Sequence, residues 1–357
     1  MPKRLNLGFD RFSGIYLWIV FIVVFGIWTP NLFLTMSTVH VLASTQAVAG
    51  IIAIAVLIPM ICGQFDLSVG SNANLTGLVA VVLQTKQHWP LLPTLLVSFA
   101  IGLLVGVVNG FVVVRFRVNS FIATMGMGTV LTAFSLIVTN SQEQAVPQSA
   151  AWNNMTQYKV FGFQVIIYFL IAFALVAWWV IEYTPVGRRM RATGGNPEAA
   201  RLSGIQVNRL SWGSLIASGG IAGAGGILYT SLTGPSLTFG STLLLPAFAA
   251  VFLGSTQLQP GRFNVWGSLI AIFVLATGVQ GLQLVSGAQW VGDMFNGVAL
   301  IVAVAMAAMR QGKPGRRWRR PASAAEELPP AQSTPASPGT GHAPTALDPV
   351  TSATDQI

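Results

Sequence analysis

Charged residues are scarce in this sequence. Only 8% of its 357 residues are Asp, Glu, Lys or Arg, whereas 53% are hydrophobic. A soluble domain carries about 25% charged residues, and a soluble fold of this length could not bury so much apolar surface. The composition therefore excludes a soluble enzyme and a soluble nucleic-acid-binding protein, in spite of a net charge of +9.

Residues that could bind a metal or perform catalysis are scarce too. The single cysteine, Cys62, allows neither a disulfide framework nor a cysteine-based zinc site, and the three histidines are scattered. The sequence has no G-x-x-x-x-G-K-[ST] phosphate-binding loop, no G-x-S-x-G and no H-E-x-x-H. We therefore predict no catalytic residue, no metal site and no cofactor bound by this chain.

Long uncharged segments occupy most of the chain. A helix needs about 20 apolar residues to cross a bilayer. Ten segments are predicted to cross the membrane, of which the first and the eighth are short: residues 15–28, 38–61, 67–85, 91–114, 119–140, 162–183, 211–232, 240–255, 264–283 and 290–309. The predicted fold is an all-α membrane protein with a transmembrane domain over residues 1–312. Residues 313–357, basic at first and then rich in Pro, Ala, Ser and Thr, are predicted to be a disordered cytoplasmic tail.

The basic residues orient these ten crossings. If the N-terminus lies in the cytoplasm, all of the 19 Lys and Arg residues except Lys86 and Lys159 fall on the inner side. Inner loops of membrane proteins carry such an excess of positive charge. We therefore predict a multi-pass protein of the inner (cytoplasmic) membrane with both termini in the cytoplasm.

Two stretches of the sequence match each other. Residues 66–83 read DLSVGSNANLTGLVAVVL and residues 236–253 read SLTFGSTLLLPAFAAVFL, and both carry an L-[ST]-x-G-S opening. They begin the third and eighth crossings, which therefore run in opposite directions. We predict an inverted repeat that relates crossings two to five to crossings seven to ten, as in many transport proteins whose pathway lies near the repeat interface.

Polar residues within the crossings are candidates for a transport pathway. Asp66 precedes the third crossing, where its carboxylate either caps the first turn of the helix or lines and gates a pathway. Most of the other polar side chains are expected to form interhelical hydrogen bonds, and a minority to face a hydrophilic solute. The candidates for the pathway are Asp66, Ser68, Ser71, Asn72, Asn74, Asn109, Asn119 and Thr124.

The inner loop between crossings six and seven contains the signals of a short helix. Asn196 is a suitable N-cap, Pro197 a suitable first residue, and Gly204 a suitable stop, which predicts a helix over 197–203. So short a helix is marginal in water by itself. It is expected to rest either on the lipid surface or against a cytoplasmic partner, and the spacing alone does not separate these two interpretations.

Four segments resemble the permease subunits of bacterial ABC importers of the ribose, xylose, arabinose and galactoside type. They are GQFDLSVGS at 63–71, VNSFIATMG at 118–126, TPVGRRMRATGGNPEAARLSGIQVNR at 184–209, and VFLGSTQLQPGRFNVWGS at 251–268. The resemblance extends over residues 40–310. It implies a transmembrane permease subunit of an ATP-driven importer for a pentose, a hexose or a sugar-like solute.

The resemblance also implies partners. These are a cytoplasmic ATPase with two nucleotide-binding modules, which would bind ATP and Mg²⁺, a periplasmic or lipid-anchored sugar-binding protein, and a second permease, either another copy or a sister chain. The short helix resembles the coupling helix that seats in the ATPase. Its contacts would involve Gly194, Gly195, Asn196, Pro197, Glu198, Ala199, Ala200, Arg201, Leu202 and Gly204.

The sequence departs from the family pattern near the predicted pathway. Gly63-Gln64-Phe65 stands where the family usually has Gly-Gly-Ile. The resemblance therefore does not fix the shape of the pathway or the identity of the substrate. A carrier or facilitator that works without an ATPase is the alternative, and it would require transport by this chain alone that depends on Asp66. A membrane enzyme is a third class, which the missing catalytic groups disfavour.

Overall fold

The computed structural model describes residues 9–311, and the predicted tail of residues 313–357 lies outside this range. The long helices are α1 (Phe9–Trp28), α3 (Met36–Ile61), α4 (Val69–Thr85), α5 (Leu91–Arg115), α6 (Ser120–Thr139), α8 (Val165–Tyr183), α11 (Val207–Thr233), α12 (Phe239–Gly254), α13 (Val265–Ser286) and α14 (Trp290–Gln311). Shorter helices are α2 (Pro30–Phe33), α7 (Ala150–Gln157), α9 (Pro185–Gly195) and α10 (Pro197–Leu202).

The helices coincide with the uncharged segments of the sequence. Each predicted crossing overlaps one long helix, and seven of the described helices are long and apolar enough to cross a membrane. The described chain is therefore all-α in its membrane-spanning part, as predicted. The apolar part of α1, Phe12–Trp28, and helix α12 are shorter.

The connection between α6 and α8 contains structure that the sequence patterns did not indicate. Helix α7 begins after Ser149, whose side chain accepts a hydrogen bond from the backbone N–H of Trp152. A small antiparallel hairpin follows, in which β1 (Lys159–Val160) pairs with β2 (Phe163–Gln164). The crossing predicted from residue 162 begins as α8 at Val165, because residues 163–164 pair in this hairpin.

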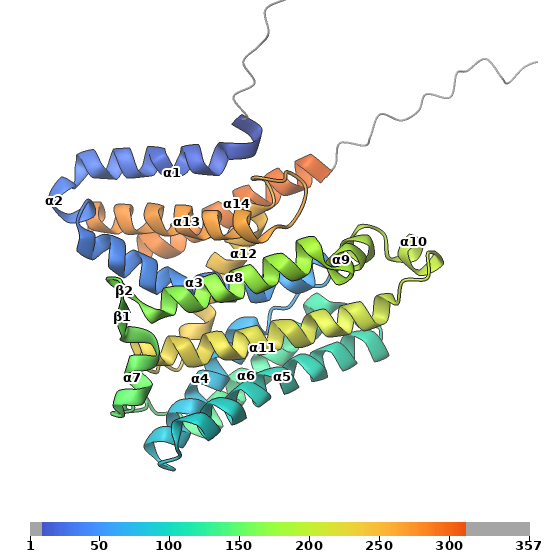
Figure 1. The fold of residues 1–357 in the computed structure, drawn as a ribbon, viewed down its shortest axis with the longest axis horizontal. Coiled ribbons are helices and arrows are strands. Elements are labelled where there is room, and N and C mark those ends of the chain that lie inside the picture. Colours follow the sequence, from blue (N-terminus) through green and yellow to red (C-terminus); the bar gives the residue numbers. More distant parts are fainter. Residues whose placement is uncertain (1–8, 312–357) are drawn as a thin grey trace, which may run out of the picture. The chain divides into compact units, whose positions relative to one another are not determined.

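Helices α3 and α11 form the centre of the bundle. In α3 the side chains from Ala47 to Leu57 are buried, and they pack against α8, α11, α12 and α13. Helix α11 lies along α5 (Figure 1), where Gly102 and Gly219 meet backbone to backbone. Small residues permit such close approach between membrane helices. The glycines on α5 thus serve packing.

The helices of the second half follow those of the first at similar distances in sequence, since α11 begins 171 residues after α3 and α13 begins 174 residues after α5. Helix α12 begins at Phe239 and α4 at Val69, and the same offset separates the start of α14 at Trp290 from the start of α6 at Ser120. Contacts correspond as well: α4 packs on α5 and α6, and α12 packs on α13 and α14. Helices α4 and α12 also contact each other directly.

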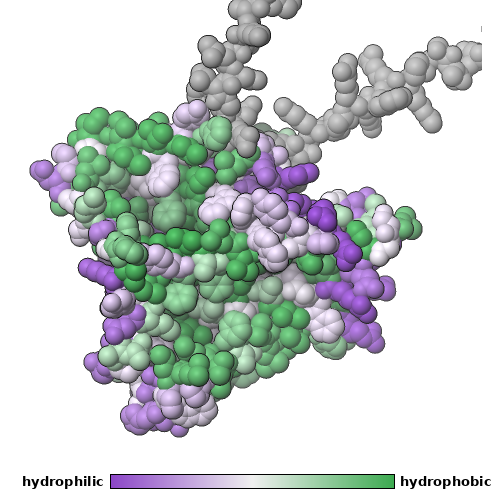
Figure 2. Space-filling view, viewed as in Figure 1, coloured by the Kyte–Doolittle hydropathy of each residue, from purple (hydrophilic) through white to green (hydrophobic). Residues whose placement is uncertain are grey.

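The connecting segments separate to the two ends of the bundle. Helices α9 and α10 lie at one end, and α7 and the hairpin at the other (Figure 1). Figure 2 shows hydrophobic residues over the middle of this face and hydrophilic residues gathered toward both ends. This distribution is that of a bundle whose flank faces lipid and whose ends face water.

Candidate functional site

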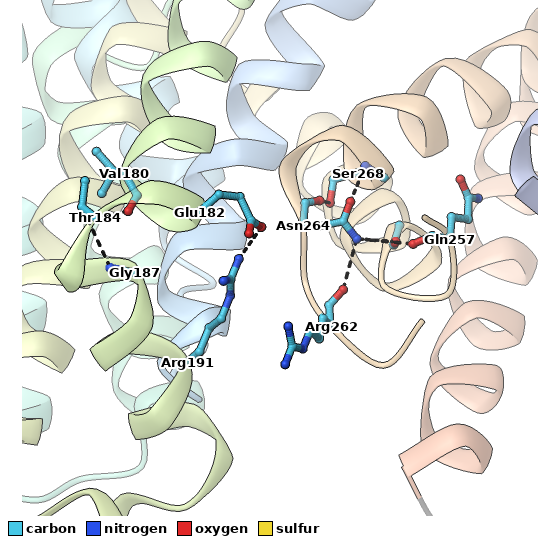
Figure 3. Close-up of polar contacts among 11 residues, drawn as sticks. Val180, Glu182, Thr184, Gly187, Arg191, Gln257, Arg262, Asn264 and Ser268 are labelled. Atoms are coloured by element: carbon cyan, nitrogen blue, oxygen red, sulfur yellow. Dashed lines mark hydrogen bonds and ion pairs between the residues drawn. The ribbon is translucent and has the colours of Figure 1, made fainter. Parts of the chain in front are cut away.

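Helix α9 connects the bundle to the predicted coupling helix. It begins after Thr184, whose hydroxyl donates to the carbonyl of Val180 (2.6 Å) and accepts from the backbone N–H of Gly187 (3.4 Å). Arg191 of α9 forms an ion pair with Glu182 of α8, and both side chains are about one-quarter exposed (Figure 3). The cap and the ion pair together fix α9 to the end of α8.

Helix α10 occupies the place that the sequence predicts. The Oδ1 atom of Asn196 accepts a hydrogen bond from the backbone N–H of Ala199 (3.0 Å), and Pro197 is the first helical residue. The helix ends at Leu202, and Gly204 adopts a φ of +80°, which a residue with a side chain rarely adopts. The prediction of a short helix here is confirmed.

The surface of α10 is almost entirely open. Ala200 is the only buried residue among those predicted to contact the ATPase, and all the others are exposed. Leu202 is 87% exposed. Arg201 donates to the Oδ1 atom of Asn208 (3.4 Å). The Arg191–Glu182 pair is the only ion pair among the side chains of residues 12–309, so Glu198 and Arg201 do not pair with each other.

A polar cavity of about 880 Å³ lies beneath α10. Arg117, Asn119, Arg201 and Asn208 line it, together with the residues that follow α3. Of the predicted pathway residues, only Asn119 reaches this cavity. Its Oδ1 atom also caps α6 by accepting from the backbone N–H of Phe121 (2.9 Å). Sequence reasoning missed Arg117 and Asn208, which no spacing connects to α10.

Asp66 lies between α3 and α4 and is buried. Its Oδ1 atom accepts from the backbone N–H (3.0 Å) and the hydroxyl (2.6 Å) of Ser68, and its Oδ2 atom accepts from the hydroxyl of Ser218 on α11 (2.8 Å). The Ser68 hydroxyl accepts in turn from Nδ2 of Asn109 on α5 (2.7 Å). The carboxylate thus joins the start of α4 to two other helices.

The polar residues farther along α4 bridge helices as well. Asn72 donates from Nδ2 to the carbonyls of Gly102 (3.3 Å) and Gly219 (3.0 Å). Asn74 donates from Nδ2 to the carbonyl of Leu237 (2.8 Å), and its Oδ1 atom accepts from the backbone N–H of Gly240 (3.3 Å). Both side chains are buried. These are the interhelical bonds expected of most polar residues in the crossings, and a pathway role for them stays a prediction.

Ser71 and Thr124 occupy different surroundings. Ser71 lines an open cleft of about 550 Å³ between α4, α6 and α12, where Thr129 and Thr132 of α6 add two further hydroxyl groups. Thr124 is buried; its hydroxyl donates to the carbonyl of Ser120 (2.8 Å) and accepts from the backbone N–H of Leu67 (2.9 Å). Among the predicted pathway residues, Ser71 thus faces the hydroxyl-lined cleft.

The sequence of this chain matches a known protein family. Residues 38–304 match the family described as "Branched-chain amino acid transport system / permease component". The match includes α3 to α13 and most of α14, and with them the Asp66 segment and α10. The chain belongs to this permease family. It is therefore a transport subunit of the membrane, and its curated relatives are transport subunits and not enzymes.

Several curated relatives resemble this permease over most of their length. The ribose import permease protein RbsC of Haemophilus influenzae is 29% identical, over 80% of this chain and 89% of its own. RbsC of Escherichia coli K12 is 30% identical, over 80% and 90%. The xylose transport system permease protein XylH of the same strain is 28% identical, over 81% and 89%. No solved structure matches the chain significantly.

Proposed function

We propose that this permease is the transmembrane subunit of an ATP-driven importer for a sugar or a sugar-like solute. The observation that carries the proposal is the similarity to sugar import permeases over about four-fifths of the chain. The cleft at Ser71 supports it, because the oxygen atoms of its three hydroxyl groups can accept hydrogen bonds from a sugar while Thr129 and Thr132 donate to the backbone of α6. The family's name refers to amino acids, whereas the relatives named above handle ribose and xylose.

The ten long helices are all membrane crossings in this proposal, with both termini in the cytoplasm. The two halves, α3–α6 and α11–α14, form an inverted repeat. Support comes from the similar offsets in sequence between equivalent helices, 170 to 174 residues, and from the contact between the equivalent helices α4 and α12. Inverted repeats allow one half to move against the other around a central pathway.

The energy comes from a separate ATPase with two nucleotide-binding modules, which holds ATP and Mg²⁺, while this chain binds no cofactor. Helix α10 is the contact to that ATPase. Its open surface and its exposed Leu202 favour a protein partner over the lipid surface, because an exposed apolar tip next to charged Glu198 and Arg201 suits a groove in a protein. A sugar-binding protein outside the membrane and a second permease complete the transporter.

Transport follows from these parts. When ATP binds, the two modules of the ATPase close and move the α10 helices that are seated in them. The bundle then opens toward the outside and accepts the sugar from the binding protein. Hydrolysis restores the inward-facing state. For the ATPase to drive the change between inward-facing and outward-facing states, α10 must contact its open and closed states differently.

The test is uptake by the purified transporter in liposomes. Ribose, xylose and fructose are supplied with the binding protein, and ATP is provided on the side of the ATPase. The proposal predicts uptake of at least one sugar that requires both ATP and the ATPase. Uptake of the same sugar by this chain alone, without ATP, would instead establish the ATP-independent carrier.

A further inference from the structure

Phe65 stands between two cavities of different character. The segment of residues 62–68 connects α3 to α4, and Phe65 in its middle is 36% exposed. On one side its side chain lines the polar cavity beneath α10. On the other side it lines an apolar groove of about 410 Å³ between α6, α12 and α14. Phe65 is therefore part of the wall between the two.

Aromatic rings close the groove at this end. The rings of Phe65 and Phe121 meet edge to face, with centroids 6.5 Å apart at an angle of 75°. Phe248 and Phe252 of α12 line the same groove. A constriction of hydrophobic side chains excludes water and polar solutes, and the four phenylalanine rings supply such side chains to this end of the groove.

The groove continues into the hydroxyl-lined cleft. Leu67 and Leu244 line both of them, and the cleft extends along α6 from Met125 to Leu136, whereas Phe121 lies at the start of that helix. A solute that moves along this face toward α10 would therefore meet hydroxyl groups first and phenylalanine rings afterwards.

The position of Phe65 is set by hydrogen bonds to α6. Its backbone N–H donates to the hydroxyl of Ser120 (2.9 Å), and its carbonyl accepts from the hydroxyl of Thr124 (3.2 Å). The backbone N–H of Leu67, two residues farther along, donates to the same Thr124 hydroxyl (2.9 Å). Segment 62–68 and the start of α6 thus hold Phe65 and Phe121 against each other.

The same segment touches the end of α9 through backbone atoms. Gly63 has a φ of +76°, and a Cβ atom built on it would lie 3.5 Å from the Cα atom of Gly194. A Cβ atom on Gly194 would clash with the carbonyl oxygen of Ile61. Since no side chain separates the two backbones, a displacement of α9 reaches residues 61–63 directly. Gly194 lies just before Asn196, the cap of α10.

We propose that Phe65 and Phe121 are the cytoplasmic gate of the sugar path and that the contact between Gly63 and Gly194 transmits the motion of α10 to this gate. The inference rests on the proposed function, which supplies the sugar and the ATPase. When the transporter returns to the inward-facing state, the movement of α10 shifts segment 62–68 and separates the rings of Phe65 and Phe121.

Thiol labelling of the complete transporter tests the gate. Cys62 is the only cysteine of this chain, so Cys62→Ser removes its thiol, and Phe65→Cys then places one thiol at the gate. Labelling is read on this chain after electrophoresis separates it from its partners. A charged thiol reagent is added on the cytoplasmic side, with and without ATP plus vanadate. The labelling rate should be roughly tenfold lower with ATP plus vanadate, because the ATP-bound transporter faces outward and the gate is then closed. The control Phe116→Cys, whose parent side chain is 64% exposed near the end of α5, should label equally in both.

Gly194→Ala tests the transmission. The added methyl group displaces residues 61–63, so the nucleotide-dependent labelling at position 65 should disappear and uptake should fall at least about tenfold. The matched control is Gly213→Ala on α11, where a Cβ atom would meet no atom within 4 Å. If Gly194→Ala does not assemble, Gly63→Ala changes the other side of the same contact and is measured in its place, with the same expected loss of nucleotide-dependent labelling.

The outcomes separate the two proposals. ATP-driven uptake by the wild type together with constant labelling at position 65 would overturn the gate and leave the importer standing. Unchanged uptake and labelling in Gly194→Ala would overturn the transmission through Gly63. Absence of any ATP-dependent uptake in the wild-type transporter would overturn the proposed function itself.

Discussion

Gly70 and Gly240 lie backbone against backbone, and each occupies the space that a side chain on the other would need. A Cβ atom on either glycine would clash with the carbonyl oxygen of the other. Next to this contact, Gly70 faces Leu244 and Gly240 faces Asn74. Since Leu244 follows Gly240 at the same spacing as Asn74 follows Gly70, the two helices meet in a reciprocal manner. An inverted repeat produces this kind of contact at its symmetry axis.

The first prediction concerns this contact. Gly70→Ala and Gly240→Ala should each destabilise the permease by about 1–3 kcal/mol, because a methyl group would force α4 and α12 apart. The measurement is the midpoint of thermal unfolding in detergent. Gly126→Ala on α6 is the control, because a Cβ atom there meets nothing within 4 Å. Equal midpoints for Gly70→Ala and Gly126→Ala would show that the contact is looser than described.

The second prediction concerns the carboxylate of Asp66. Asp66→Asn replaces one oxygen by an amino group that faces the hydroxyls of Ser68 or Ser218, so a buried donor loses its acceptor, at a cost of about 1–3 kcal/mol. Ser218→Ala should cost less, and the double variant should cost less than the sum of the two, because both act on one network. Strictly additive changes in the unfolding midpoint would refute the network.

The third prediction concerns the cap of α10. Asn196→Ala removes the acceptor for the N–H of Ala199 and should cost about 1 kcal/mol of helix stability. A frayed α10 should bind the ATPase more weakly, which a titration of the permease with purified ATPase would detect. Asn196→Asp keeps an oxygen at the cap and should retain binding. Equal binding by both variants would exclude a role for the cap.

The fourth prediction concerns Arg201. Arg201→Glu reverses the charge on the open face of α10 and should uncouple ATP hydrolysis from uptake while the chain still inserts into the membrane. Arg188→Glu makes the same change at an exposed position on α9 and serves as the control. Sugar uptake and ATP hydrolysis are measured on the same liposomes. Unchanged uptake in Arg201→Glu would remove α10 from its assigned role.

The sequence predicts the helices of this protein well and its contacts poorly. Helix α10 could be located from Asn196, Pro197 and Gly204 because capping is local, and the long helices because a bilayer demands long apolar segments. The hydrogen bond from Ser218 to Asp66 joins residues far apart in the chain, and no local sequence pattern predicts it. The approach of Gly194 to Gly63 likewise depends on the packing of α9 against α3. Ser71 and Asn72 are neighbours in the sequence, and both were predicted to line the pathway. Only the folded structure shows that Ser71 lines the cleft whereas Asn72 is buried.

The central claim is that this permease works with a separate ATPase, and co-purification tests it most directly. The tagged full-length chain is extracted from its native membrane in a gentle detergent, and mass spectrometry identifies the proteins that accompany it. We expect an ATPase with two nucleotide-binding modules in the purified complex, and a different permease sequence beside this one would show a mixed pair. A chain that purifies alone and transports sugar into liposomes without ATP would instead be an ATP-independent carrier.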